Sequence, residues 1–255
     1  MHLPLVNQFI NPHLIYNERE ATQEDINTRL INGCHPLMLH DKVKLDVIDS
    51  IKTPEKAIKY ILNGQHTNSI ESAIATSLNN KNSNHRDCIN MMPSKTPRIL
   101  SKYQIEYNTR NGKPDMLQVN NAILGNGEIL SDNQILFHGG GILKNTQAGS
   151  SFTTNRPLST SFCPYKALLN GMHYGKYYNE NEVNIITFTV DKISQPAFVF
   201  KINGTNKGHE KEVLIASGAT LKVVNKTLIK SNYTVYCCSG SSKIVPAYLV
   251  EATIS

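Results

Sequence analysis

The feature that most constrains the fold is a change of pattern near residue 97. From there on, short apolar runs alternate with Asn-Gly and other glycine-containing turns, which is typical of antiparallel strands. Seven runs are expected to be strands: 135–137, 185–190, 197–200, 213–216, 221–224, 234–237 and 248–250. One helix is expected among them, from Pro164 to about Met172. The second part of the chain should therefore be mainly antiparallel β-sheet.

The part before residue 97 predicts helices instead. A first helix covers 25–31 before Gly33, and apolar residues within 43–51 indicate a second. Thr53 and Pro54 combine an N-cap with a proline at the first helical position, which starts a third helix. A fourth is expected at 70–78, followed by an Asn- and Ser-rich linker through 79–84. Helices first and strands later indicate an α+β protein.

Length and composition exclude several classes of protein. The 255 residues suffice for one large domain or two small ones. No apolar run approaches the ~20 residues that span a bilayer, and no basic residue precedes the first apolar ones, so neither a transmembrane segment nor a classical signal peptide is expected. Five irregularly spaced cysteines argue against a disulfide framework. No metal is expected, because these residues match no zinc signature: Cys34, His35, His40, His85 and Cys88.

The net charge of +6 leaves the type of partner open. A positive field attracts nucleic acid, acidic membrane surfaces or phosphate-rich small molecules. The basic residues are scattered, with no run of five or more, so a polybasic arm is not expected. The partner must be inferred from motifs.

Residues 136–141, a strand that runs into three glycines, form the first stretch that could carry chemistry. Such glycines let the backbone approach a ligand, and successive free N–H groups can hold a phosphate; alternatively, they simply end the strand in a turn. His-Gly-Gly-Gly also forms the oxyanion loop of esterases. That interpretation fails, because no Gly-x-Ser-x-Gly nucleophile elbow follows Gly141.

Two further stretches carry hydroxyl and carboxylate groups. In residues 158–162, strand alternation places Ser159 and Ser161 on one face, where they could hold a carboxylate and a sugar hydroxyl, or merely precede a helix cap. Glu210 and Glu212 lie where a polar loop enters an apolar strand. One carboxylate could steady a developing cation while the other handles a proton or a cationic nucleophile, unless both belong to a solvated strand entry.

Taken together in this order, the three stretches resemble the active site of mono-ADP-ribosyltransferases of the cholera-toxin-like class. That family has an aromatic-Arg strand followed by Gly, a Ser-Thr-Ser strand, and Glu-x-Glu leading into an apolar strand. The best match is 210–215 with Gly218 and 221–223, and the resemblance runs from about residue 130 to the C-terminus. The departure is His138, where the family has arginine; the diphtheria-toxin-like and poly-ADP-ribose-polymerase branch has histidine at this strand position.

The resemblance implies an α+β fold, an ADP-ribosyltransferase-like split β-sandwich of mainly antiparallel strands with an N-terminal helical region. Residues 97–255 would form the catalytic domain and residues 1–96 a cap or target-binding region. The implied reaction cleaves the nicotinamide–ribose bond of NAD through an oxocarbenium-like transition state and transfers ADP-ribose to an arginine of a host protein. NAD would be the substrate, without a metal. The loop 203–209 would meet the target protein.

The resemblance also implies residue roles. Glu212 would stabilise the cation, Ser159 would position Glu212 and the ribose, and Glu210 would orient and deprotonate the acceptor arginine. The residues implied to bind NAD are His138, Gly139, Ser159, Thr160 and Ser161.

Two alternatives stay open at this point: an NAD glycohydrolase that uses water as acceptor, and an inactive NAD-binding scaffold of the same fold. The resemblance implies a bacterial effector delivered into a host cell, acting in the cytosol or on an organelle. Nucleic acid is not the expected partner.

Overall fold

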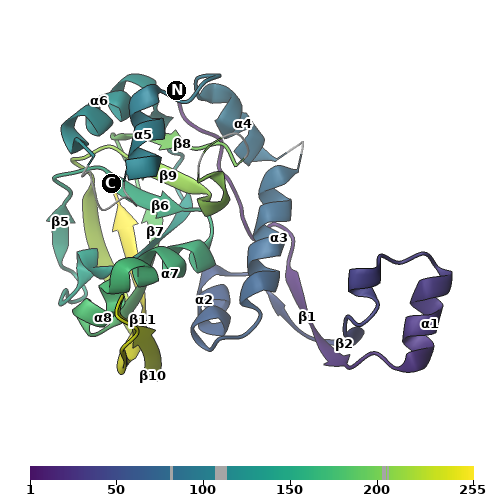
Figure 1. The fold of residues 1–255 in the computed structure, drawn as a ribbon. Helices are drawn as coiled ribbons and strands as arrows, with labels where there is room; N and C mark the ends of the chain where they lie inside the picture. The colour runs from purple at the N-terminus through teal and green to yellow at the C-terminus, as the bar shows by residue number, and fades with distance from the viewer. Residues whose placement is uncertain (81–82, 107–113, 203–204, 206) are drawn as a thin grey trace.

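A nine-stranded sheet forms the body of the protein in the computed structural model, which describes residues 1–80, 83–106, 114–202, 205 and 207–255 (Figure 1). The strand order is β3-β8-β9-β6-β4-β7-β11-β10-β5. The strands are β3 (Glu128–Ile129), β4 (Ile135–Gly139), β5 (Ser151–Thr153), β6 (Leu158–Ser161), β7 (Val183–Val190), β8 (Pro196–Val199), β9 (Glu212–Ile215), β10 (Thr220–Tyr236) and β11 (Ser242–Ile254). Among these neighbours only β7 and β11 run parallel.

The sheet is split between β4 and β6. In its described part these two strands share one residue pair, Phe137 with Ser161, whereas β4 continues along β7 and β6 continues along β9 over their full lengths. The strands β3, β8, β9 and β6 thus form one half of the sheet, and β4, β7, β11, β10 and β5 form the other. The ends of β4 and β6 consequently diverge, which opens space for side chains between them.

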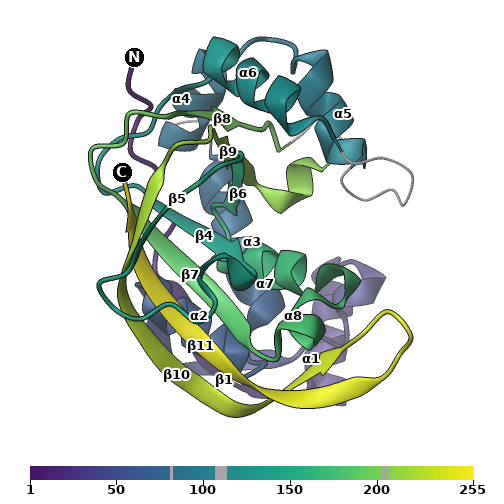
Figure 2. The ribbon, with the colours of Figure 1, turned by 90° about the vertical axis from the view of Figure 1, so that its left-hand side faces the viewer.

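Helices cover the two halves of the split sheet. They are α2 (Pro54–Leu62), α3 (Thr67–Asn79), α4 (Asn84–Met91), α5 (Arg98–Glu106), α6 (Met116–Asn126), α7 (Pro164–Met172) and α8 (Lys176–Glu180). The α6 helix packs on β8, and α7 packs on β4 and β7 (Figure 2). The α2 and α3 helices contact α7, and α2 also contacts β10 and β11, so the N-terminal region packs against both a helix and the sheet.

A separate arm extends from the body (Figure 1). It consists of β1 (His13–Arg19), β2 (Val43–Ile51) and α1 (Gln23–Ile31), and its two strands pair antiparallel. The α1 helix contributes no buried residue, although Thr22 and Asp25 form a reciprocal capping box at its start. The arm is therefore fastened to the body at its base, where Ile15 and Ile51 are buried.

The structure confirms the α+β class and the mainly antiparallel sheet. The helices expected at 25–31, 70–78 and from Thr53 correspond to α1, α3 and α2, and the helix from Pro164 ends at Met172 as expected. All seven expected strand runs lie within, or end one residue beyond, strands. The division at residues 96 and 97 stays a prediction.

Several expected elements were wrong. The segment 43–51 is strand β2, not a helix, because it pairs with β1. The helix at Pro164 is not alone after residue 97, since α5, α6 and α8 also lie there. The runs 221–224 and 234–237 belong to one strand, β10, which ends at Tyr236 and whose pairing with β11 is interrupted by register shifts. In the expected linker, Asn79 ends α3 and Ser83 caps α4; residues 81 and 82 lie outside the described residues.

All five cysteines are free thiols. Cys88 and Cys163 are buried, Cys237 is partly exposed, and Cys34 and Cys238 are exposed. Among the described helices, none has both the length and the apolar content to cross a membrane.

Candidate active site

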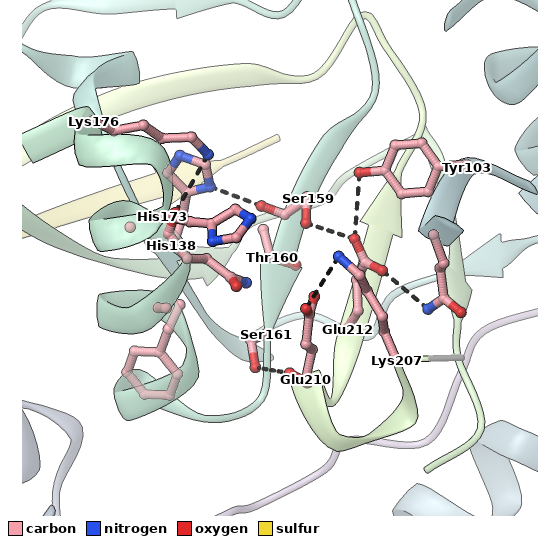
Figure 3. A pocket seen from close by; sticks show the side chains of 15 residues that line it. Tyr103, His138, Ser159, Thr160, Ser161, His173, Lys176, Lys207, Glu210 and Glu212 are labelled. Carbon is pink, nitrogen blue, oxygen red and sulfur yellow. Dashed lines mark hydrogen bonds and ion pairs between the residues drawn. The ribbon is translucent and has the colours of Figure 1, made fainter. Parts of the chain in front are cut away.

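A cleft lies where the sheet splits, bordered by β4, β6, β9, α5 and α7 (Figure 3). It consists of two adjoining cavities, a smaller one and a larger one. Their shared lining residues are Tyr103, His138, Gly139, Ser159 and Lys176. The smaller cavity also contains Glu210 and Glu212, so the cleft brings together the residues that the three sequence stretches predicted.

Glu212 is the buried carboxylate of the cleft, with 4% of its surface exposed. Ser159 Oγ donates to its Oε1 at 2.7 Å, and Tyr103 Oη donates to the same oxygen at 3.4 Å. Gln104 Nε2 donates to Oε2 at 3.2 Å. Burial raises the pKa of Glu212, and the hydrogen bonds from Ser159 and Gln104 oppose that rise because they stabilise the charged form.

Glu210 reaches the same cavity through an unusual backbone turn. It ends a short 3₁₀ helix, Gly208–Glu210, whereas Glu212 begins β9. Between them Lys211 adopts a left-handed conformation, with φ at +53°. The two carboxylates therefore face one cavity through a turn ahead of the strand. Glu210 Oε1 lies 3.4 Å from Lys207 Nζ, forming an ion pair at the mouth of the cavity.

The three hydroxyls of β6 have different partners. Ser159, Thr160 and Ser161 all line the smaller cavity. Ser161 Oγ donates to the Glu210 carbonyl oxygen at 2.7 Å and accepts from Cys163 N at 3.0 Å. Thr160 Oγ1 donates to the Val213 carbonyl oxygen at 2.8 Å. Ser159 thus holds the Glu212 side chain, while the other two hydroxyls fasten the backbone around it.

His138 bridges the split in the sheet with its side chain. Its Nδ1 lies 2.7 Å from the Ser159 carbonyl oxygen, and since a carbonyl can only accept, Nδ1 carries the proton. Burial, together with the nearby positive charges of Lys176 and Arg156, lowers the pKa of His138 to about 4, although the hydrogen bond to the Ser159 carbonyl oxygen opposes this fall. The ring is therefore neutral near pH 7, and its Nε2 keeps an acceptor lone pair that suits a sugar hydroxyl.

Gly139, the last residue of β4, allows close packing. A Cβ on Gly139 would lie 1.8 Å from the Ala167 carbonyl oxygen, so only glycine lets α7 approach β4 this closely. Of the two possibilities that the sequence left open for this stretch, the hydrogen bonds agree with the strand-ending turn. Gly140 N donates to the Asn184 carbonyl oxygen at 3.4 Å, and Gly141 N donates to Glu180 Oε1 at 3.1 Å.

Four residues of the cleft carried no sequence signal that pointed to them. Tyr103 and Gln104 come from α5, a helix that the sequence patterns did not predict. Lys176 lines both cavities, and Arg156 lines the larger one. These two cations act on His138 and outnumber Glu180, the one carboxylate among the described residues that line the larger cavity, so this end of the cleft keeps a net positive charge that suits a phosphate-bearing ligand.

No cluster of three or more potential metal ligands occurs among the described residues. His85 Nδ1 contacts the Leu78 carbonyl oxygen at 3.2 Å, and Cys88 Sγ contacts the Pro4 carbonyl oxygen at 3.3 Å, so both have other partners. Of the loop 203–209, expected to meet a target, residues 203, 204 and 206 lie outside the described residues.

No protein-family model and no curated protein sequence matches this chain. The structure is similar to C3larvin toxin, an ADP-ribosyltransferase from Paenibacillus larvae, with 14% identity, a TM-score of 0.36 and coverage of 67% of this chain and 92% of that chain. It is similar to Plx2a, an ADP-ribosyltransferase toxin from the same species, with 12% identity, a TM-score of 0.39 and coverage of 67% of this chain and 90% of that chain. It is also similar to ADP-ribosyltransferase Vis in complex with agmatine, with 11% identity, a TM-score of 0.36 and coverage of 80% of this chain and 87% of that chain. At TM-scores this low we interpret the site from its own geometry.

Proposed function

We propose that the protein is an NAD-dependent mono-ADP-ribosyltransferase that transfers ADP-ribose to an arginine of a host protein and releases nicotinamide. One observation carries the proposal. A buried glutamate, Glu212, is held by Ser159 at 2.7 Å, with a second carboxylate, Glu210, in the same cavity. This is the arrangement expected for splitting a glycosidic bond and directing a cationic nucleophile to the resulting centre.

In the bond-breaking step the C1′–N bond of the nicotinamide ribose breaks, and its electron pair leaves with nicotinamide. Positive charge then develops on the ribose C1′ and ring oxygen, as in glycoside hydrolysis. Glu212 supports this charge electrostatically and accepts a hydrogen bond from the 2′-hydroxyl. Its burial strengthens the effect, because charges attract more strongly where water is excluded. Ser159 keeps the carboxylate oriented.

In the transfer step a guanidinium nitrogen bonds to C1′ and loses a proton to Glu210. A carboxylate suits this acceptor, because planar guanidinium and carboxylate groups pair in a forked geometry. Glu210 is now paired with Lys207 Nζ at 3.4 Å. The acceptor arginine would replace this lysine, so the resting enzyme already holds Glu210 against a cation.

The two ends of the cleft suit the two ends of NAD. The nicotinamide ribose would lie at Glu212 and Ser159, and the adenosine and diphosphate would lie toward His138 and Gly139. Lys176 and Arg156 supply the positive charge that a diphosphate needs near this end. Thr160 and Ser161 support the cleft through their backbone contacts.

The proposal also covers the remaining parts of the chain. Residues 97–255 would act as the catalytic domain, and residues 1–96 as a cap or target-binding region. The protein would be a bacterial effector delivered into a host cell, as the sequence resemblance implies.

Incubation with labelled NAD and host-cell lysate tests the proposal. Wild-type protein is expected to release nicotinamide and to label a protein on arginine, located by mass spectrometry. Glu212→Gln keeps the side-chain volume but removes the charge, and should lower nicotinamide release about 100-fold or more. Asp191→Asn, at an exposed position directly after β7, is the matched control and should leave the rate unchanged.

The same experiment separates the alternatives. Free ADP-ribose without labelled protein would indicate an NAD glycohydrolase, and no turnover at all would indicate an inactive NAD-binding scaffold. Full protein labelling by Glu212→Gln would contradict the proposed mechanism.

A further inference from the structure

Glu71, on α3 in the N-terminal helical region, reaches the loop that carries the two site glutamates. Its Oε1 lies 2.8 Å from Lys166 Nζ and 3.5 Å from Lys211 Nζ. Lys166 belongs to α7, and Lys211 is the left-handed residue between Glu210 and Glu212. One carboxylate therefore joins three segments that are far apart in the sequence.

Lys211 combines two unfavourable features. It is 3% exposed, and a buried lysine is costly unless its ammonium group is paired. Its left-handed backbone is also strained for a residue with a Cβ. Its Nζ has two partners, Glu71 and the His209 carbonyl oxygen at 3.3 Å. These contacts compensate for the cost of burying the ammonium group. Since they fix the position of the side chain, they also hold the strained turn in place.

The charges around Glu71 favour a strong attachment of its carboxylate to the two lysines. Burial alone would raise the pKa of Glu71, but Lys166 and Lys211 outweigh burial and lower it. Glu71 is therefore ionised near pH 7 and attracts both lysines. Replacing it with glutamine would leave the buried Lys211 ammonium group without its counter-charge, which is costly.

The two site glutamates depend on this turn to different degrees. Glu212 is held by Ser159, Tyr103 and Gln104, and its strand pairs with β6 and β8. Glu210 lies before the strand, in the 3₁₀ turn, where its carboxylate contacts Lys207 and its carbonyl contacts Ser161. Loosening Lys211 should therefore displace Glu210 more than Glu212.

We propose that Glu71 is a positioning residue that fixes the Lys211 turn and thereby aims Glu210 at the acceptor. The inference rests on the proposed function for the role of Glu210. It gives the helical region a direct part in acceptor selection, because α3 determines where the acceptor-facing carboxylate lies while the bond-breaking carboxylate is held from the sheet.

The test compares two activities of one enzyme: ADP-ribosylation of agmatine, a small guanidine, and hydrolysis of NAD by water. Glu71→Gln should lower the transfer rate about tenfold and hydrolysis less than about twofold, so the ratio of the two rates should change by about fivefold or more, which is about 1 kcal/mol in favour of hydrolysis. Lys211→Met should act alike, and the double variant should lose little more, because either single change already breaks the pair between Glu71 and Lys211. Asp191→Asn, the exposed control, should keep the wild-type ratio.

The ratio of transfer to hydrolysis distinguishes a loss of Glu210 positioning from a loss of folded protein. A variant that only unfolds part of the population lowers both rates equally, so a parallel loss in Glu71→Gln would overturn the inference, as would no loss. Amide hydrogen exchange of the peptide covering 207–212 gives a second measurement that does not depend on NAD. Faster exchange in Glu71→Gln, with unchanged exchange in β7, is expected; unchanged exchange at 207–212 would also overturn it. Absence of NAD turnover in wild-type protein would instead refute the proposed function.

Discussion

At the scale of single residues, burial and hydrogen bonding act on Glu212 in opposite directions. Burial favours the neutral acid, whereas Ser159 and Gln104 favour the carboxylate. The proposed chemistry needs the carboxylate. Activity should therefore fall as the pH drops through the raised pKa of Glu212, which lies above that of a free glutamate.

The Gln104→Leu variant tests this balance. Leucine removes a donor to the charged form, so the pKa of Glu212 rises further and the acidic limb of the kcat/KM profile moves to higher pH. On that limb kcat/KM should fall about tenfold, the value of one hydrogen bond to a charged group. Gln118→Leu, on the exposed surface of α6, is the control. An acidic limb at the wild-type pH in Gln104→Leu would show that another group titrates there.

The residues of the site were unequally predictable. Ser159 and Glu212 belong to short motifs whose chemistry can be read in order along the chain, and the structure places them in hydrogen-bond contact. Gln104 reaches Glu212 across 108 residues of sequence, from a helix with no motif of its own. Long-range partners of this kind depend on how helices pack against the sheet, which local patterns do not encode.

At the scale of elements, β4 and α7 are packed closely enough to form the floor of the cleft. The contact requires glycine at position 139, because any Cβ there would overlap the Ala167 carbonyl oxygen at 1.8 Å. The Ala167 backbone cannot rotate away as a side chain could. To make room for a Cβ at position 139, either α7 or β4 must therefore move as a unit.

Gly139→Ala is therefore expected to lower the free energy of unfolding by about 3 kcal/mol, at the upper end for overpacking, measured by urea denaturation. Gly125→Ala on α6 is the matched control. Nothing lies within 4 Å of the place that its added methyl group would take, and alanine should stabilise that helix by up to about 1 kcal/mol. Equal stability of the two variants would contradict the close contact between β4 and α7.

Helices and strands were predictable from the sequence where their local signals agreed. They were not predictable where pairing with another strand determined the structure. Thr53 and Pro54 give a cap and a helix start, and α2 begins there. In 43–51 the apolar positions fit helical spacing and strand alternation about equally well, and pairing with β1 settles the outcome. For α6 a signal was available, because Asp115 accepts hydrogen bonds from Leu117 N and Gln118 N as an N-cap.

At the scale of the whole molecule, the helical region and the sheet share one hydrophobic core. Ile58 and Leu62 of α2 and Ile70 of α3 are buried in the same cluster as Phe188 and Val250 of the sheet. The chain's N-terminal residues also cross the body, with Leu3 N bonded to the Ile129 carbonyl oxygen at 2.7 Å. Neither part would keep its apolar surface covered alone.

The shared core predicts one cooperative unfolding transition for the body. Calorimetric and van't Hoff enthalpies should agree, and far-ultraviolet circular dichroism should change at the same midpoint. Ile58→Ala, a fully buried change in the helical region, should cost about 2–5 kcal/mol and shift the whole transition. Two separate transitions, with only one shifted by Ile58→Ala, would contradict a shared core.

The free cysteines are placed so that their reaction with a thiol reagent would report local opening of the body. Cys88 lies in the helical region and Cys163 at the start of α7, both buried, while the other three thiols are accessible to some degree. A thiol reagent should first consume the accessible groups and then reach the buried pair only as fast as each part of the body opens. Peptide mapping of the two late adducts would time the opening of the N-terminal helices against that of the cleft, without an introduced label.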